Sequence, residues 1–281
     1  MTGAATSGRQ PVALITGASA GIGTEFARVF ARQGHRLVLV ARREPRLQEL
    51  AGEIAAAGRP RPHVLALDLG AAGASQRITA ELAALGVEPQ YVVNNAGFGM
   101  MGFAAELEPA PQLAMIDLNV RLLTELSLAF TDSLARHRGG IINVASVASY
   151  LPGPGMAVYF ASKAFVLSFS EALHQELSGR GIRVTTLCPG VVPTEFQGRA
   201  GMKKMPMADF LCTRPADIAE AGYAGLMRGR RVVVPGLGNK AVTLLTRLLP
   251  RRVFLEAVAH SQMMRSKNSD RPLKKAVREA P

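Results

Sequence analysis

The sequence predicts an α/β fold, in which a doubly wound parallel sheet of about seven strands carries helices on both faces and a helical extension follows at the C-terminus. Through the first two-thirds of the 281 residues, short apolar segments alternate with longer segments of helical periodicity. The apolar segments are almost continuously hydrophobic, as is typical of parallel strands that helices cover on both sides. No internal repeat or linker divides this part of the chain.

The predicted strands are short, apolar and bounded by turn residues; they span 12–16, 36–41, 63–67, 91–94, 141–145, 184–187 and 231–234. The predicted helices have apolar residues three and four positions apart; the clearest span 21–33, 44–57, 112–135, 157–178 and 215–227. Crossovers between consecutive parallel strands are right-handed, which produces the doubly wound arrangement.

The composition is that of a folded protein in a reducing compartment. Hydrophobic residues make up 48% of the chain, which excludes disorder for its body. Cys188 and Cys212 are far apart and lack the spacing of metal ligands, so we expect free thiols and no metal site. The chain shows neither a signal-peptide core nor an apolar run long enough to span a membrane. We therefore expect a cytoplasmic protein.

The net charge of +12 is concentrated in the C-terminal third. Residues 199–281 carry 17 Lys and Arg against 6 Asp and Glu, whereas residues 1–198 carry 16 against 15. A solvated surface, or helices packed on the domain or on another subunit, explains such a segment. The alternative is an amphipathic helix that contacts an anionic carrier or an anionic membrane. Nucleic-acid binding is not expected, because no aromatic stacking platform or reading motif is present.

A glycine-rich turn, T-G-A-S-A-G-I-G at 16–23, links the first predicted strand to the first predicted helix. Glycines let such a turn approach a pyrophosphate, and the helix N-terminus supplies free N–H groups and a positive dipole end. The alternative, a turn that is merely tight, is disfavoured by the strand before it and the helix after it. The expected dinucleotide contacts are Gly17, Ser19, Ala20, Gly21, Ile22 and Gly23.

The end of the second predicted strand indicates which nicotinamide cofactor binds. A carboxylate at this position accepts hydrogen bonds from a free ribose 2′-hydroxyl and repels a 2′-phosphate. The sequence has Arg42 and Arg43 there, and a guanidinium forms paired hydrogen bonds with a phosphate. We expect NADP(H) rather than NAD(H), with Arg42 as the main contact; the alternative is two solvated surface arginines.

Several motifs follow one another in a fixed order; they are T-G-A-S-A-G-I-G at 16–23, Asp68-Leu69, N-N-A-G at 94–97, Asn119, Ser146, Y-F-A-S-K at 159–163 and P-G-V-V-P-T at 189–194. In their order and spacing the chain resembles the short-chain dehydrogenase/reductase family, in its single-domain branch. The resemblance implies a Rossmann-type NADP-binding and catalytic domain over 11–236, with a substrate lid at about 195–213. Residues 1–10 would be a flexible N-terminus and 237–281 a basic amphipathic extension.

The resemblance also implies roles for single residues. Asn94 would pin the fourth strand, and Asn119 would kink its helix and hold a water for proton relay. The further implied cofactor contacts are Asp68, Leu69, Asn95, Ala96, Gly97, Tyr159, Lys163, Pro189, Gly190, Val192 and Thr194. Members of the family usually pair through two long central helices, which implies a homodimer or homotetramer.

The predicted catalytic group also follows from chemistry. Tyr159 and Lys163 are four residues apart on a predicted helix and share a face. An ammonium favours a nearby phenolate, so we expect Lys163 to lower the pKa of Tyr159 from its usual value of about 10. Tyr159 would protonate the alkoxide that forms when a carbonyl accepts a hydride, and Ser146 would bind the carbonyl oxygen. By itself, a tyrosine four residues before a lysine is often only structural.

We therefore expect reversible reduction of a ketone or aldehyde by NADPH. The apolar residues that would line the pocket are 150–156, Phe98, Met100, Met101, Phe103, Phe196, Met202, Met205 and Met207. Such a lining suits a hydrophobic substrate, unless these side chains simply belong to the core. Two alternatives remain open: a non-catalytic NADP(H)-binding sensor or scaffold, and a lipid- or acyl-directed reductase that its basic tail recruits to anionic surfaces.

Overall fold

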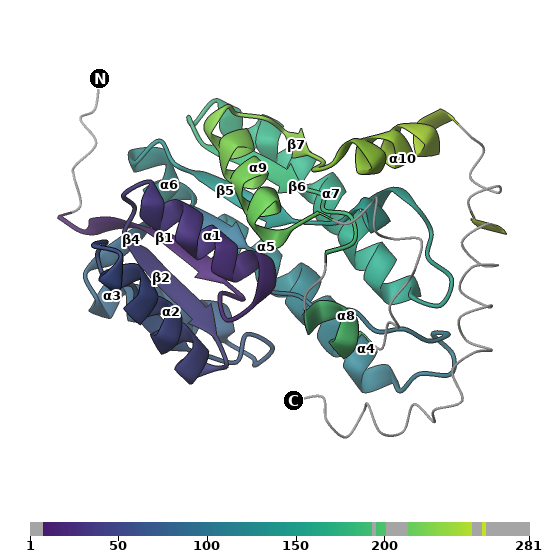
Figure 1. Cartoon of the computed structure of the whole chain (residues 1–281), viewed down its shortest axis with the longest axis horizontal. Helices are drawn as coiled ribbons and strands as arrows, with labels where there is room; N and C mark the ends of the chain where they lie inside the picture. Colours follow the sequence, from purple (N-terminus) through teal and green to yellow (C-terminus); the bar gives the residue numbers. More distant parts are fainter. Residues whose placement is uncertain (1–7, 193–194, 201–212, 249–254, 257–281) are drawn as a thin grey trace.

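The computed structural model describes residues 8–192, 195–200, 213–248 and 255–256, most of which belong to one sheet and the helices around it (Figure 1). The strands are β1 (Gln10–Thr16), β2 (Leu37–Ala41), β3 (His63–Ala66), β4 (Val87–Asn94), β5 (Gly140–Val144), β6 (Arg183–Leu187) and β7 (Val232–Val233). All seven are parallel, in the order β3-β2-β1-β4-β5-β6-β7. The predicted doubly wound α/β fold is confirmed.

The helices alternate with the strands along the chain. They are α1 (Gly21–Arg32), α2 (Glu44–Ala56), α3 (Ala74–Ala84), α4 (Pro109–Ile116), α5 (Leu123–Ala129), α6 (Thr131–Arg136), α7 (Ala157–Ser178), α8 (Glu195–Arg199), α9 (Pro215–Met227) and α10 (Leu237–Leu248), with a π-helical segment η1 (Asp117–Leu122) and a 3-10 segment η2 (Val147–Tyr150). Within the described ranges, no helix is long and apolar enough to cross a membrane. Most of the predicted N-terminus (1–10), lid (195–213) and extension (237–281) lies outside these ranges.

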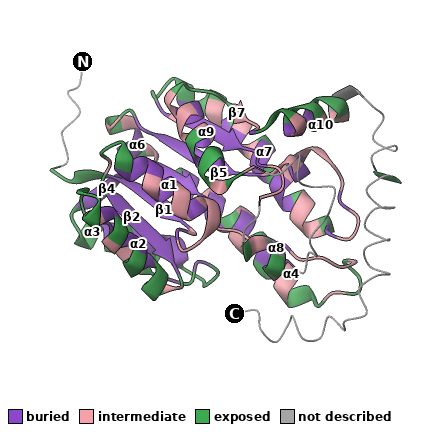
Figure 2. Ribbon diagram, viewed as in Figure 1, coloured by how far each residue is buried: buried purple, intermediate pink, exposed green. Residues whose placement is uncertain are grey.

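Strand side chains alternate between two apolar cores, one on each face of the sheet. The central strands are buried along most of their length (Figure 2). In β1, Ala13 and Ile15 pack with α1, α2 and α9, whereas Val12 and Leu14 pack with α3, α5, α6 and α7. A parallel strand that helices cover on both faces buries every side chain, which is why the strand segments are apolar without interruption.

β1 and β4 are neighbours at the centre of the sheet, although β2 and β3 separate them in the sequence. The chain adds strands outward from β1 to β3 in one direction and from β4 to β7 in the other. Because the strands are parallel, their carboxyl ends lie along one edge, and a ligand crevice forms where the direction reverses. The loops after β1, β2, β4, β5 and β6 all leave the sheet at this edge.

The predicted helix at 112–135 is not continuous. It starts earlier, at Pro109, widens into η1, and is interrupted at Phe130, whose φ of −111° and ψ of 13° separate α5 from α6. Asn119 lies in η1, where its side chain accepts from the N–H and donates to the C=O of Phe98. These bonds hold the wide turn against the loop after β4. The helical periodicity of the sequence does not reveal this contact.

Strand β4 is longer than the predicted 91–94 because it continues back through Pro89. Proline lacks the N–H that a central strand needs, and in strands it is confined to edges, first positions and bulges. The register between β1 and β4 shifts here and passes over Gln90, which is the pattern of a β-bulge. The carbonyl of Gln90 then lies against Gly139, where a Cβ atom would overlap it.

Gly139→Ala is expected to lower the free energy of unfolding by about 2–4 kcal/mol, because the added methyl meets backbone that has no room to move. Chemical denaturation followed by circular dichroism measures the change. Gly179→Ala is the matched control, since a Cβ there meets nothing within 4 Å and its φ of −65° suits alanine. Equal stability of the two variants would contradict this account of the bulge.

Candidate active site

Close backbone contacts shape the glycine-rich loop after β1. Gly17 has a φ of +67°, and a Cβ on it would lie 2.8 Å from Asn95 Nδ2. A Cβ on Gly23 would overlap the Gly17 carbonyl. Ala20 precedes α1 and provides no side-chain cap, so this helix N-terminus suits an anion. The loop and the first turn of α1, which fit a pyrophosphate, contain the predicted contacts Gly17, Ser19, Ala20, Gly21, Ile22 and Gly23.

Thr16 holds the glycine-rich loop to the end of β4. Its Oγ1 donates to the Val93 carbonyl at 3.1 Å and accepts from the N–H groups of Asn95 (3.0 Å) and Ala96 (3.1 Å). Asn95 Nδ2 donates back to the Thr16 carbonyl at 3.0 Å. The predicted cofactor contacts Asn95, Ala96 and Gly97 therefore lie directly beside the loop.

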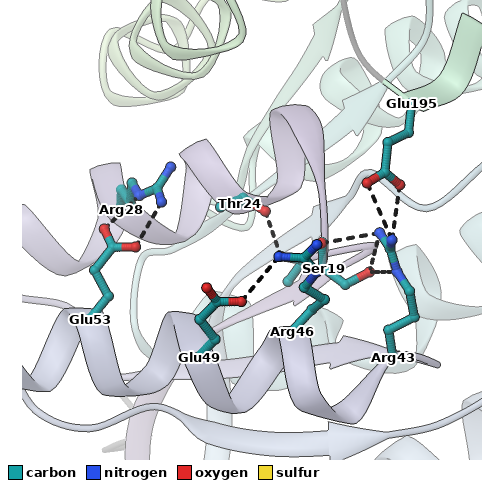
Figure 3. A network of polar contacts seen from close by, with 9 residues as sticks. Ser19, Thr24, Arg28, Arg43, Arg46, Glu49, Glu53 and Glu195 are labelled. Atoms are coloured by element: carbon teal, nitrogen blue, oxygen red, sulfur yellow. Dashed lines mark hydrogen bonds and ion pairs between the residues drawn. The ribbon is translucent and has the colours of Figure 1, made fainter.

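Arg43 lies across the glycine-rich loop (Figure 3). Its Nε and Nη2 each donate to Ser19 Oγ at 3.3 Å, and Nη2 also donates to the Ser19 carbonyl at 3.2 Å. Its Nη1 forms an ion pair with Glu195 Oε2 at 3.0 Å. Arg42, which the sequence favoured as the main phosphate contact, is exposed just after β2. The arginine that reaches the loop is Arg43.

The predicted adenine contacts follow β3. Asp68 is exposed and Leu69 is buried. The Asp68 carboxylate accepts a hydrogen bond from the Gly70 N–H at 2.9 Å, so the turn orients it.

Four of the predicted cofactor contacts follow β6. Pro189 is buried, Gly190 and Val192 are partly buried, and Thr194 lies outside the described residues. Asn239 of α10 packs on Gly190, where a Cβ atom would overlap the Asn239 amide. The C-terminal extension therefore contacts the loop that carries these residues.

Ser146, Tyr159 and Lys163 come together beyond the carboxyl end of β5. Ser146 Oγ accepts from the Ala148 N–H at 3.1 Å at the start of η2 and lies 3.5 Å from the Pro189 carbonyl, and the Ser146 hydroxyl favours the ionised form of Tyr159. Lys163 lies one turn after Tyr159 on α7, and its buried Nζ donates to the Val144 carbonyl at 2.8 Å. The ammonium lies 6.0 Å from the centre of the Tyr159 ring.

Burial dominates the protonation of this group. It raises the pKa of Tyr159 to about 12, against a smaller opposite effect of the hydrogen bond from Ser146. Burial also lowers the pKa of Lys163 to about 8. The expected lowering of the Tyr159 pKa by Lys163 is thus not observed, because the ammonium faces Val144 and desolvation of the phenol outweighs its charge. Tyr159 is protonated at neutral pH.

Asn119 joins the catalytic group from η1. It is fully buried, and its Nδ2 donates to Ser162 Oγ at 3.1 Å. Ser162 in turn donates to the Tyr159 carbonyl at 2.7 Å. Gly97 lies against both Asn119 and Lys163, since a Cβ on it would be 2.8 Å from Asn119 Oδ1 and 3.5 Å from Lys163 Nζ. All four predicted catalytic residues are therefore brought together next to the glycine-rich loop.

A small, open, largely apolar hollow with a cavity volume of about 10 Å³ lies beside Tyr159; its lining is Met100, Gly102, Ala104, Leu107, Gln112, Met115, Met156, Ala157, Val158 and Tyr159. The sequence anticipated Met100 and Met156 but not the side of the pocket formed by Leu107 and α4. Phe196, also anticipated, packs on Tyr159 with the ring centroids 5.5 Å apart. Residues Met202, Met205 and Met207 lie outside the described ranges.

Cys188 is a free, buried thiol, and Cys212 lies outside the described ranges. Among the residues whose structure is described, no group of three or more His, Cys, Asp or Glu side chains is placed to hold a metal ion.

Sequence reasoning missed three residues that the structure places at the site. Thr16 stands in the glycine-rich motif, but its hydroxyl has no visible role until β4 lies beside it. Glu195 and Asn239 gave no signal, because their partners Arg43 and Gly190 are distant in the sequence.

Comparisons with known proteins agree with this geometry. A family profile described as short chain dehydrogenase matches residues 11–204. Sulfoacetaldehyde reductase 2 of Chromohalobacter salexigens is 40% identical over 188 residues, which cover 66% of this chain and 74% of that protein. The NADP-dependent 3-hydroxy acid dehydrogenase YdfG of Escherichia coli K12 is 34% identical over 75% of this chain and 86% of its own length.

A solved short-chain dehydrogenase from Sphingobium yanoikuyae, in complex with NADPH, superimposes with a TM-score of 0.74 at 31% identity and covers 93% of this chain and 98% of its own. The profile match spans more than half of the chain, and the motifs it contains meet at one place in the fold. The chain therefore belongs to the short-chain dehydrogenase family, whose members are oxidoreductases of alcohol and carbonyl groups that use a nicotinamide cofactor.

Proposed function

We propose that this protein reduces a ketone or aldehyde to the alcohol, reversibly, with NADP(H) as the cofactor. The observation that carries the proposal is the convergence of Ser146, Tyr159, Lys163 and Asn119 beside the glycine-rich loop. When bound, the reduced nicotinamide supplies a hydride to the carbonyl carbon. Ser146 donates a hydrogen bond to the carbonyl oxygen, and the protonated Tyr159 delivers the proton that completes the alcohol.

Two residues position Tyr159 for this role. Ser162 bonds its main-chain carbonyl, and Asn119 bonds Ser162, so the start of α7 is tied to the loop after β4. The Lys163 ammonium, close to Gly97, would bond the nicotinamide ribose and return protons toward Tyr159. Asn119, fully buried, would orient a water in that relay.

The preference for NADP(H) over NAD(H) rests on the end of β2. Arg42 and Arg43 stand where a carboxylate would select a free 2′-hydroxyl, and Arg43 already bonds the glycine-rich loop. The relative from Escherichia coli is named NADP-dependent, and the Sphingobium structure contains NADPH.

Tyr159→Phe is expected to reduce the rate of NADPH-dependent carbonyl reduction at least about 100-fold, because only the proton donor is removed. NADPH oxidation at 340 nm with a panel of ketones and aldehydes measures the rate, and fluorescence titration measures cofactor binding, which should be retained. Phe160→Tyr, the neighbouring ring, serves as a control for a local change in packing. Unchanged turnover in Tyr159→Phe would refute the assignment, and absence of turnover in the wild type across the panel would favour the sensor or scaffold hypothesis.

Lys163 is expected to lower the free energy of unfolding at neutral pH. Because burial lowers the pKa of Lys163 to about 8, the folded state disfavours the charged form below pH 8. Between pH 8 and the unfolded value of 10.5 the folded protein releases the proton first, so the penalty fades. Lys163→Met removes the penalty together with the activity.

We expect Lys163→Met to raise the free energy of unfolding by about 1–2 kcal/mol at pH 7, and to raise it less as the pH increases from 8 to 10.5. Thermal unfolding of variant and wild type at matched pH tests this. Lys240→Met, at an exposed position, is the control and should change little. A gain that is independent of pH, or a loss at pH 7, would contradict the burial argument.

The pocket beside Tyr159 favours a hydrophobic substrate. Its walls combine methionine side chains with Leu107, and Gln112 is a polar member among them. The Gln112 amide donates to three backbone carbonyls of the adjoining loop. It therefore stabilises the wall of the pocket more than it offers a free hydrogen-bond donor to a substrate. A carbonyl flanked by apolar groups therefore suits this site.

Family members are typically oligomeric, and we propose a homodimer or homotetramer for this chain. Large apolar side chains are exposed on the helices that flank the site opposite the cofactor loop; they are Leu113 and Ile116 of α4, Leu128 of α5 and Phe165 of α7. Pairing of these helices would bury them.

A second proposal concerns α10, in which polar side chains are buried and apolar side chains are exposed. Its polar residues Asn239 and Thr243 are buried, whereas Leu237, Leu244 and Leu245 are exposed, with Leu244 59% exposed. Lys240 is exposed beside them, and the sequence beyond α10 is basic. An apolar face that includes an exposed lysine and precedes a basic sequence suits the surface of an anionic membrane, where lipid or acyl substrates are found.

Leu244→Ser/Leu245→Ser is expected to weaken binding to phosphatidylglycerol vesicles about fivefold or more, while turnover of a soluble carbonyl is retained. Co-sedimentation at two salt concentrations measures binding. Leu85→Ser is the control, because Leu85 at the end of α3 is 43% exposed, close to the 45% of Leu245. Equal binding of the wild type to neutral and anionic vesicles would end the membrane hypothesis.

A further inference from the structure

The first two residues of α8 contact opposite ends of the active site. Glu195 pairs with Arg43 at the glycine-rich loop, with Oε2 at 3.0 Å and Oε1 at 3.3 Å from Nη1 (Figure 3). Phe196 packs on the Tyr159 ring and lies against Gly99. The short helix thus spans the distance between the cofactor loop and the catalytic tyrosine.

Contacts on both sides hold α8 in this place. The N–H of Ala200, at the end of the helix, donates to the Phe196 carbonyl, and the Ala200 carbonyl accepts from the N–H of Met101 at 3.1 Å. The Phe196 ring fills the space above Gly99, where a Cβ would lie 3.0 Å from its Cζ. Because these contacts position the backbone, the Glu195 carboxylate loses little further freedom when it pairs with Arg43.

The carboxylate and a phosphate compete for the same donors. Arg43 directs two of its nitrogens to Ser19 and presents Nη1 to Glu195. A phosphate monoester binds a guanidinium through the same planar set of N–H groups and carries nearly twice the charge of a carboxylate. The side chains of Arg43 and Glu195 are 35% and 49% exposed, so their pair is weak and a phosphate can displace it.

Resting on the proposed use of NADP(H), we propose that Glu195 is a specificity-determining residue for the cofactor's adenosine phosphate. Its carboxylate occupies the guanidinium of Arg43 until a 2′-phosphate takes its place. Glu195 therefore weakens the binding of every ligand that carries this phosphate. It leaves ligands without the phosphate unaffected, because they leave the ion pair intact.

The test is isothermal titration calorimetry of the full chain with adenosine 2′,5′-bisphosphate and with 5′-AMP, which differ only in the 2′-phosphate. Glu195→Gln keeps the shape and removes the charge. We expect it to tighten bisphosphate binding by roughly three- to tenfold and to leave 5′-AMP binding within about twofold. The gain should shrink at high salt and vanish in the Arg43→Met background.

Glu220→Gln is the matched control. Glu220 is 53% exposed and pairs with Arg32 on the other side of α1, so this variant makes the same change in net charge away from the site. An equal gain in Glu220→Gln, an equal gain for both nucleotides, or no gain in Glu195→Gln would overturn the proposal. The Arg43→Met variant distinguishes failure of the NADP(H) site from failure of the role of Glu195. If Arg43→Met does not weaken bisphosphate binding, the proposed NADP(H) site is wrong as well. If Arg43→Met weakens binding but Glu195→Gln has no effect, only the role of Glu195 is wrong.

Discussion

The whole site depends on one crowded contact, the approach of the glycine-rich loop to the end of β4. Thr16 maintains it with one donated and two accepted hydrogen bonds, and Gly17 offers no side chain to obstruct it. Because β1 and β4 are neighbours where the strand order reverses, the cofactor loop lies beside the loop that leads to Asn119. The catalytic helix α7 is connected to the same place through Ser162. The strand order of the parallel sheet therefore brings the glycine-rich loop and the loop after β4 close together, and a few hydrogen bonds fix how these loops and α7 are oriented.

Catalysis and stability make opposite demands at the end of β5. A buried ammonium is costly, and Lys163 has one backbone carbonyl, that of Val144, as its hydrogen-bond partner among the described side-chain contacts. The same desolvation keeps Tyr159 protonated, which suits the role of proton donor that we propose for it. A more polar environment would lower the cost of the buried ammonium and would bring the pKa of Tyr159 back toward its ordinary value of about 10.

The sequence was sufficient for features that depend on local pattern. Strand periodicity, the ends of α7 and α9, and the convergence of Ser146, Tyr159 and Lys163 all follow from segments that carry their own signal. Features that depend on a distant partner were missed. The extension of β4 through Pro89 requires Gly139 against Gln90, whereas an irregularity at Asn119 was expected, but only from the family resemblance. The Tyr159 pKa and the pairing of Arg43 with Glu195 likewise arise from burial and from contact between residues far apart in the chain.

The packing of Asn239 on Gly190 divides the C-terminal extension into two parts with different freedom to vary. Between β7 and Asn239 the connection has a required length, because one inserted or deleted residue would rotate α10 by about 100° and withdraw the amide from the glycine. The same rotation would turn the exposed leucines toward the protein and bring Thr243 out. The residues before Asn239 are therefore constrained in number by the loop after β6, and those of α10 that follow it by the burial of Thr243.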